Sequence, residues 1–284
     1  MAHGTERGIL RTWKFWRRVA VIFALVVAGS AVTALDRHSV QADWRTASRE
    51  PTGIAPDPAT DREAIIQVYG ARAYNWRGYF GIHTWIAVKP TDAERFTVYE
   101  VMGWRARRGG DAVAVSERAP DGRWFGAAPA ILADIRGEGV DQMIERIEAA
   151  VESYPYREEY TVWPGPNSNT FTAHIARAVP ELQLDLPPTA IGKDYIPDGG
   201  VFAMAPSGTG VQVSLFGLLG VMGALEEGLE FNVLGLTFGI DLNRPALKLP
   251  LAGRIGSENG LSNGGYIGPS GDLSENTSNG ADGT

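Results

Sequence analysis

Ser168 is the first candidate for a reactive side chain, because the stretch WPGPNSNTF, residues 163–171, predicts that a helix begins there. A side chain in the first turn of a helix lies near unpaired backbone N–H groups and the positive end of the helix dipole. This environment favours a developing alkoxide or oxyanion, as acyl transfer requires. The alternative is structural, since Asn167, Ser168 and Asn169 are all good N-cap residues and PGPN is an ordinary turn.

A serine nucleophile needs a base, and His83 is the only histidine within the predicted strands. Glu100 lies on the next predicted strand and would orient the imidazole as the third member of a catalytic triad does. The alternatives are a histidine that is simply hydrogen-bonded on a sheet and a glutamate that faces water. His83 and Glu100 are therefore the candidate partners of Ser168.

Four more polar residues are candidates for binding a ligand: Asn167 and Asn169 beside Ser168, and Lys193 and Asp194 in the segment AIGKDY. The alternative for the last two is a surface loop. A metal site is not expected, because the chain has four histidines, no cysteine, and no H-x-x-H or H-x-H pair. No cofactor is expected, since PSGTG at 206–210 lacks the lysine and the spacing of a phosphate-binding loop.

The composition is that of a globular protein. The chain has 284 residues, of which 44% are hydrophobic and 21% charged, enough for a sizeable core. Its formal charge of −7 argues against nucleic acid as a partner. The absence of cysteine excludes disulfides, thiolate catalysis and a lipoprotein anchor.

The N-terminal residues predict a membrane anchor. The uncharged run VAVIFALVVAGSAVTAL, residues 19–35, just reaches the length needed to cross a bilayer. Basic residues precede it and should stay in the cytoplasm: Arg11, Lys14, Arg17 and Arg18. We therefore expect a single-pass protein of the cytoplasmic (inner) membrane, which contacts the lipid bilayer through this helix and has its domain on the periplasmic side. A cleaved secretory signal and a buried soluble helix are the alternatives.

Five segments follow from this pattern. We expect a basic cytoplasmic leader at 1–18, a transmembrane signal-anchor at 19–35, a spacer at 36–62, a globular domain at 63–256 and a disordered tail at 257–284. The spacer is polar and contains three prolines, whereas the tail is rich in glycine, serine and asparagine and has too few apolar residues to form a core.

The globular domain shows both strand and helix patterns. Stretches rich in β-branched and aromatic residues predict strands at 64–74, 81–90, 95–104 and 112–117. Apolar residues at helical spacing predict helices at 140–153 and from about 167 to 179. The glycine-rich residues after 201 predict a meander of strands. Along the second strand, alternation places His83 and Trp85 on one face, and Ile82 and Thr84 on the other.

Several stretches together resemble a bacterial family catalogued as domain of unknown function 3750: HTWIAVK, YEVMGW, WPGPNSNTF, LPPTAIGKDY, SGTGVQVSLFGLLG and NRPALKLP. The resemblance covers about residues 65–254 and implies no activity.

A more distant resemblance links the chain to circularly permuted papain-like proteins, relatives of NlpC-type peptidases and lecithin:retinol acyltransferase. In these proteins a strand histidine precedes a helix that begins with the nucleophilic cysteine. The resemblance matches His83 to the histidine, Ser168 to the cysteine, Phe171 to the aromatic residue that packs the helix, and Glu100 to the third polar member. Serine in place of cysteine is much harder to activate.

The predicted fold class is α+β, with one N-terminal transmembrane helix followed by a papain-like mixed domain and a glycine-rich antiparallel extension. The predicted function is that of a membrane-anchored cell-envelope protein with a papain-like pocket. It would act as a serine-dependent hydrolase or acyltransferase, with Ser168 as nucleophile, His83 as base and Glu100 as orienter. The alternative is a non-catalytic envelope binding or scaffold module that has lost the nucleophilic cysteine.

Overall fold

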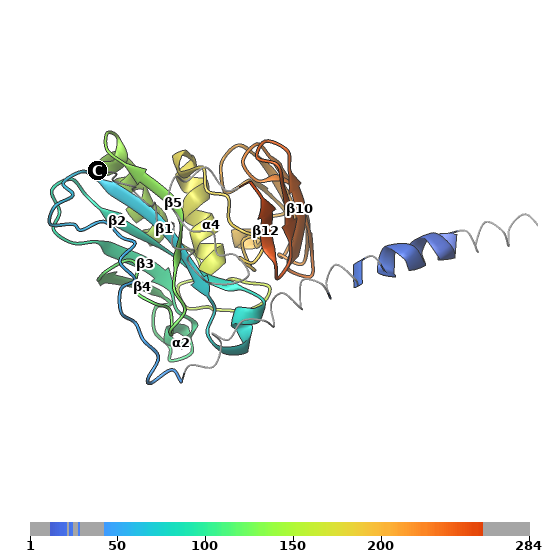
Figure 1. The fold of residues 1–284 in the computed structure, drawn as a ribbon, viewed down its shortest axis with the longest axis horizontal. Helices are drawn as coiled ribbons and strands as arrows, with labels where there is room; N and C mark the ends of the chain where they lie inside the picture. Colours follow the sequence, from blue (N-terminus) through green and yellow to red (C-terminus); the bar gives the residue numbers. More distant parts are fainter. Residues whose placement is uncertain (1–11, 22, 25–27, 29–42, 258–284) are drawn as a thin grey trace, which may run out of the picture.

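The computed structural model describes residues 12–21, 23, 24, 28 and 43–257, and every structural statement below refers to these residues. They form two antiparallel sheets with helices between them (Figure 1). The first sheet has the order β4-β3-β2-β1-β5. Its strands are β1 (Ile65–Arg72), β2 (Ile82–Lys89), β3 (Thr97–Val101), β4 (Val113–Glu117) and β5 (Ala130–Arg136).

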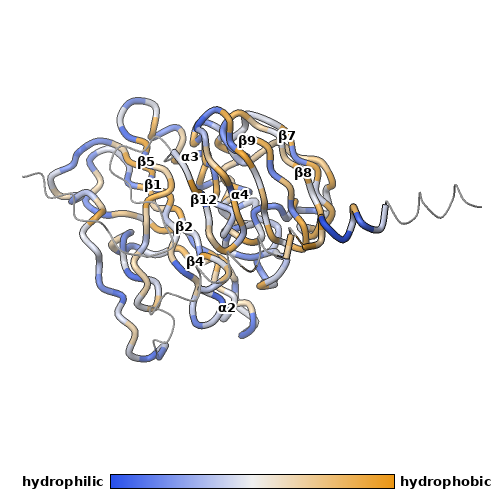
Figure 2. Tube along the Cα trace, turned by 45° about the vertical axis from the view of Figure 1, so that its right-hand side comes forward, coloured by the Kyte–Doolittle hydropathy of each residue, from blue (hydrophilic) through white to orange (hydrophobic). Residues whose placement is uncertain are grey.

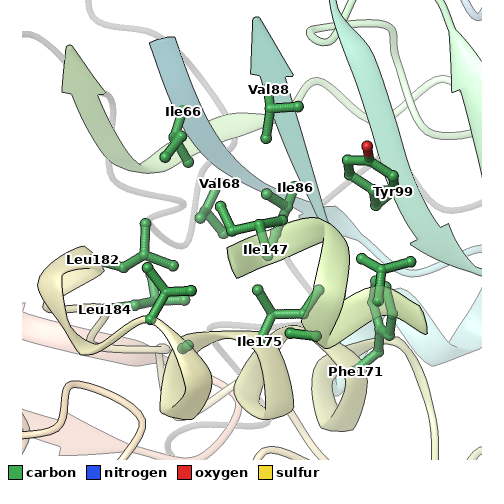
Figure 3. Packing of buried hydrophobic residues seen from close by; sticks show 14 of the residues in the cluster. Ile66, Val68, Ile86, Val88, Tyr99, Ile147, Phe171, Ile175, Leu182 and Leu184 are labelled. Carbon is green, nitrogen blue, oxygen red and sulfur yellow. The ribbon is translucent and has the colours of Figure 1, made fainter. Parts of the chain in front are cut away.

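Two helices cover one face of the first sheet: α3 (Val140–Glu152) and α4 (Ser168–Ala178). Their apolar residues pack against β1 and β2 in the main core, where Phe171 and Ile175 lie close to Ile86 (Figure 3). The opposite face of the sheet carries a smaller core that includes Tyr69 and Trp85, whose rings stack at 5.7 Å. The alternation expected along β2 is therefore present in the structure.

The second sheet is a seven-stranded meander in the order β12-β11-β10-β9-β8-β7-β6. Its strands are β6 (Phe202–Met204), β7 (Gly210–Leu215), β8 (Leu219–Ala224), β9 (Gly228–Val233), β10 (Leu236–Asp241), β11 (Ala246–Leu249) and β12 (Gly253–Gly256). The turn between β9 and β10 has positive φ at both Leu234 and Gly235, as a two-residue hairpin turn of the right twist requires. Helix α4 lies between the two sheets (Figure 1). Arg177 of this helix donates hydrogen bonds to Met204 O and to Gln212 Oε1 on the second sheet.

Four short helical turns complete the domain. They are η1 (Asn75–Tyr79), α2 (Gly103–Ala106), η2 (Pro180–Leu182) and η3 (Pro197–Gly199). The first two lie at the ends of β1 and β3, where each strand leaves the sheet, and both contribute to the candidate site described below.

The prediction of a transmembrane helix over residues 19–35 is wrong. In the described ranges no helix is both long enough and apolar enough to cross a bilayer. The described helical residues 12–21 include Lys14, Arg17 and Arg18. Much of the predicted anchor lies outside the described residues, at 22, 25–27 and 29–35. The signal-anchor and the single-pass placement in the inner membrane, which depended on this helix, are corrected with it.

Part of the predicted spacer at 36–62 lies against the domain. The carboxylate of Asp121 accepts hydrogen bonds from the backbone N–H groups of Thr52, Gly53 and Ile54, at 3.1, 2.6 and 3.0 Å. Three charge-assisted bonds from successive amides fix this segment to the loop before β5. The predicted leader lies outside the described residues at 1–11, and the predicted tail at 258–284.

Candidate functional site

A cavity of about 580 Å³ opens where β3 leaves β2. β2 pairs with β3 only from Ile86 to Val88, so the first half of β2 has no neighbouring strand on that side. Residues of η1, α2, the start of α4 and the segment at 160–163 surround this opening. The volume lies within the range usual for small-molecule sites.

Aromatic side chains form most of the cavity wall: Tyr74, Trp76, Phe80, Trp104, Trp124, Phe125, Tyr160 and Trp163. Several contact one another, as Tyr74 and Phe125 do with ring centroids 4.8 Å apart. The Trp163 indole N–H donates to Leu234 O at 2.9 Å, which ties this wall to the second sheet. The wall is therefore apolar, broad and held in place from both sheets.

His83 and Glu100 form a buried polar pair beside the cavity. His83 Nε2 lies 3.2 Å from Glu100 Oε2, and Arg118 donates to Glu100 Oε1 at 3.2 Å. Burial raises the pKa of Glu100, but the hydrogen bond and charge of His83 and the charge of Arg118 outweigh it, so that the pKa is lowered. Glu100 is therefore a carboxylate at neutral pH.

Trp124 fixes the orientation of the His83 ring. The two rings stack with centroids 3.7 Å apart and an interplanar angle of 8°. With Nε2 facing the Glu100 carboxylate, the neutral imidazole has its proton on Nε2 and an acceptor at Nδ1. In this tautomer Nε2 donates to the Glu100 carboxylate, and Nδ1 is the nitrogen that can accept a proton.

Ser168 is buried at the first position of α4 and lines the same cavity. Its side chain and its backbone amide are hydrogen-bonded to the Tyr160 hydroxyl. Burial raises the pKa of Tyr160, and these bonds with Ser168 oppose that rise without cancelling it. The phenol is consequently protonated at neutral pH.

The structure brings His83 and Ser168 to one cavity without pairing them. Among the hydrogen bonds of the described residues, His83 is bonded to Glu100 and Ser168 to Tyr160, and none joins the two. His83 lies on the face of β2 that α4 does not cover, since its neighbour Thr84 points to α4 and donates to Asn169 Oδ1 at 2.9 Å. The two side chains reach the cavity from opposite sides of the strand.

The two asparagines beside Ser168 hold the start of the helix. Asn167 Oδ1 accepts from the N–H groups of Asn169 and Thr170 at 2.9 and 3.3 Å, and its amide donates to Ile191 O at 3.1 Å. Asn169 donates to Ile82 O and to Ile191 O. Both amides are bonded within the protein, and neither lines the cavity.

Lys193 and Asp194 lie beneath the second sheet rather than in a surface loop. Lys193 forms an ion pair with Glu230, and Asp194 accepts from Gln212 and Asn232 at 2.6 and 2.7 Å. Burial lowers the pKa of Lys193, but the charges of Asp194 and Glu230 outweigh it and raise the pKa. These two residues belong to a buried charged network and do not line the cavity.

Two arginines in the cavity wall were not singled out from the sequence. Arg77 of η1 and Arg107 after α2 make no ion pair with a carboxylate among the described residues, and their charges act on Tyr160. Arg77 lies over the Trp76 ring at 5.3 Å. The density of aromatic residues and arginine in YNWRGYF, residues 74–80, is the signal that could have indicated them. No group of three His, Asp or Glu side chains in the described ranges is placed to hold a metal ion.

Part of the chain matches a protein-family model. No curated protein and no solved structure matches the chain. Residues 63–195 match the family model described as "Protein of unknown function (DUF3750)". This range contains β1 to α4 and most of the cavity wall, including His83, Glu100 and Ser168. Residues 63–195 are therefore similar to the DUF3750 family, over slightly less than half of the chain.

Proposed function

We propose that the domain binds an amphipathic small molecule that has an apolar body and an acidic head group. One observation carries the proposal: a cavity with aromatic walls also contains two arginine side chains, Arg77 and Arg107, that have no carboxylate partner among the described residues. Aromatic walls favour an acyl chain or a ring, through apolar burial and stacking. Arginine favours a carboxylate or a phosphate, which its planar fork binds through two parallel hydrogen bonds.

Other polar groups near Arg77 and Arg107 also favour binding of the acidic head group at this end of the cavity. Arg77 and Arg107 both act electrostatically on Tyr160, and Tyr160 is hydrogen-bonded to Ser168 at the first turn of α4. The N-terminal end of a helix favours an anion through its dipole. Two cations, a phenolic O–H and a helix N-terminus would therefore stabilise one negative charge.

The test is a titration with dodecanoate and, as a neutral analogue, 1-dodecanol. Four tryptophans line the cavity, so that binding of either compound should change the intrinsic fluorescence. Dodecanoate should bind more tightly than dodecanol. In the variant Arg77→Gln/Arg107→Gln this preference should fall roughly 10- to 100-fold, since a hydrogen bond to a charged group contributes about 1.5–3 kcal/mol.

Arg95→Gln is the matched control, because Arg95 pairs with Glu117 on the surface and does not line the cavity. It should leave both affinities unchanged. Equal binding of the acid and the alcohol to the natural chain, or an unchanged preference in the double variant, would contradict the proposal.

A second candidate function is ester hydrolysis or acyl transfer in the same cavity. Two observations favour it. Glu100 is hydrogen-bonded to Nε2 of His83, which leaves Nδ1 as an acceptor, and both His83 and Ser168 line the cavity. Ser168 would have to exchange its bond with Tyr160 for one with His83 Nδ1. The hydroxyl would then give its proton to Nδ1 as Oγ bonds to the ester carbonyl carbon. That proton would pass to the departing alcohol, and water would release the acyl group.

The assay for this second function is hydrolysis of p-nitrophenyl dodecanoate. Ser168→Ala and His83→Gln should each lower the rate by about a thousandfold or more if the step occurs. Ser153→Ala is the control, because Ser153 ends α3 outside the cavity. A rate that Ser168→Ala leaves unchanged would rule out the serine mechanism while leaving the binding function intact.

A further inference from the structure

The outer face of the second sheet, which faces away from α4, is apolar and exposed. Figure 2 shows hydrophobic residues recurring along β7, β8 and β9, on the side of the molecule away from β1. Val211 is 63% exposed, Leu219 is 55% exposed and Phe202 is 77% exposed. Contiguous apolar surface of this kind on a soluble domain usually marks an interaction site.

The inner face of the same sheet is polar. Glu230 and Asn232 alternate with the outward residues of β9, and Lys248 of β11 donates to Asp185 Oδ1 and Glu230 Oε1, both at 2.7 Å. Ordinarily one face of a sheet is apolar towards the core and the other is polar towards water. Here the polar face meets the domain, and the apolar face is turned outward.

Residues on the outer face form continuous cross-strand rows. One row follows directly paired positions from β6 to β10: Phe202, Val213, Val221, Phe231 and Phe238. Side chains at paired positions of neighbouring strands contact one another. The row is therefore an apolar band across five strands, and at one end of it Phe238 is in contact with Phe23, with ring centroids 5.3 Å apart.

We propose that the apolar N-terminal segment, residues 19–35, packs from Phe23 onwards along this band of the second sheet in the same chain. Phe23 belongs to that segment, and its contact with Phe238 places one end of it on the band. The segment is a run of seventeen uncharged residues, and its described residues are exposed to solvent. Both surfaces are apolar, so that removing both from water is favourable.

The dimensions of the two surfaces agree. Thirteen residues, the number from 23 to 35, would extend roughly 20 Å as a helix at 1.5 Å per residue. Five neighbouring strands span about 19 Å at 4.7–4.9 Å spacing. A helix about 10 Å across also fits within strands of up to six residues, which are about 20 Å long. The segment therefore has the length to cover the band from Phe238 to Phe202.

Disulfide trapping tests this contact cleanly, because the natural chain has no cysteine. The full-length double variant Phe23→Cys/Phe238→Cys should form an intramolecular disulfide under mild oxidation, seen as a faster monomer band on a non-reducing gel. Phe23→Cys/Val115→Cys is the matched control, since Val115 is equally a surface residue but lies on β4 of the first sheet (Figure 1). It should form no intramolecular disulfide.

A third variant tests the band itself. Adding Val221→Glu to the first cysteine pair places a charge in the centre of the band and should lower the disulfide yield several-fold. Adding Val211→Ala, which keeps the face apolar, should not. Three results would overturn the proposal. The first is that the two thiols of the Phe23→Cys/Phe238→Cys variant react with maleimide but do not oxidise to a disulfide, and the second is that a disulfide forms only between two chains. The third is that the full-length chain floats with phosphatidylcholine vesicles through the outer face. The dodecanoate titration is independent of all three.

Discussion

Gly103→Ala should deform the cavity by displacing the Tyr160 ring. A Cβ at position 103 would lie 2.5 Å from Cδ1 of Tyr160 and 2.8 Å from both Cε1 and Cγ, which is well inside van der Waals contact. Tyr160 is partly buried against the main core and bonded to Ser168, so the ring cannot turn away without losing that bond. Overpacking of this kind typically costs about 1–3 kcal/mol. For a domain of this size the midpoint of thermal unfolding should fall by roughly 2–12 °C.

A double-mutant cycle measured by urea unfolding separates the clash from other effects. Tyr160→Ala removes the ring that Gly103→Ala would strike, so the double variant should lose less stability than the sum of the two single variants. Gly110→Ala is the control, since the nearest atom to its added Cβ is Arg105 O at an ordinary 3.6 Å. Strict additivity of the two substitutions, or a Gly103→Ala variant as stable as the natural chain, would refute the described packing of Tyr160 on Gly103.

Three further substitutions follow from buried polar groups. The pKa of Glu100 is lowered on folding, so its stabilising contribution is present above the ordinary value of about 4.5 and is lost as the pH falls through the folded value. Chemical unfolding from pH 7 to pH 3 should show this loss in the natural chain and not in Glu100→Gln. Lys248→Met removes the cation that Asp185 and Glu230 share and leaves them with Arg254 and Lys193, and should cost about 1.5–3 kcal/mol in urea unfolding; a cost below 1 kcal/mol would contradict the network. Asn167→Ala removes the cap of α4 and should cost about 1–2 kcal/mol by the same assay, whereas no loss would show that the cap is dispensable.

The helices were predictable because their ends carry local signals. Helix α3 was expected at 140–153 and occupies Val140–Glu152, and α4 begins at Ser168 after the Asn167 cap. Strand β5 (Ala130–Arg136) was not foreseen, since its side chains show no simple alternation between buried and exposed positions. Its place at the edge of the sheet beside β1 depends on contacts between distant segments, which a local pattern does not contain.

At the candidate site, the sequence did not show which face of each strand the helices cover. Alternation correctly separated His83 from Ile82 on β2, but a period of two does not say which face the helices cover. The structure places α4 on the Ile82 face, and His83 therefore stacks on Trp124 instead of meeting Ser168 directly. The same ambiguity applies to the second sheet, where the polar face turned out to be the inner one.

The cavity itself could not be predicted from neighbouring residues. Its aromatic wall comes from four separate parts of the chain, which meet only because β3 leaves β2 early and α2 turns back. Trp163 and Ser168 of the stretch WPGPNSNTF both line the cavity. Arg77 and Arg107 lie in the cavity wall only because the fold brings η1 and α2 together.

The most direct test of the proposed binding function is a crystal structure of the chain grown with dodecanoate. The alkyl chain should lie among the aromatic residues of the cavity, and the carboxylate within about 2.7–2.9 Å of a guanidinium nitrogen of Arg77 or Arg107. Dodecanoate bound only on the outer face of the second sheet, or a cavity left empty at saturating ligand, would contradict it.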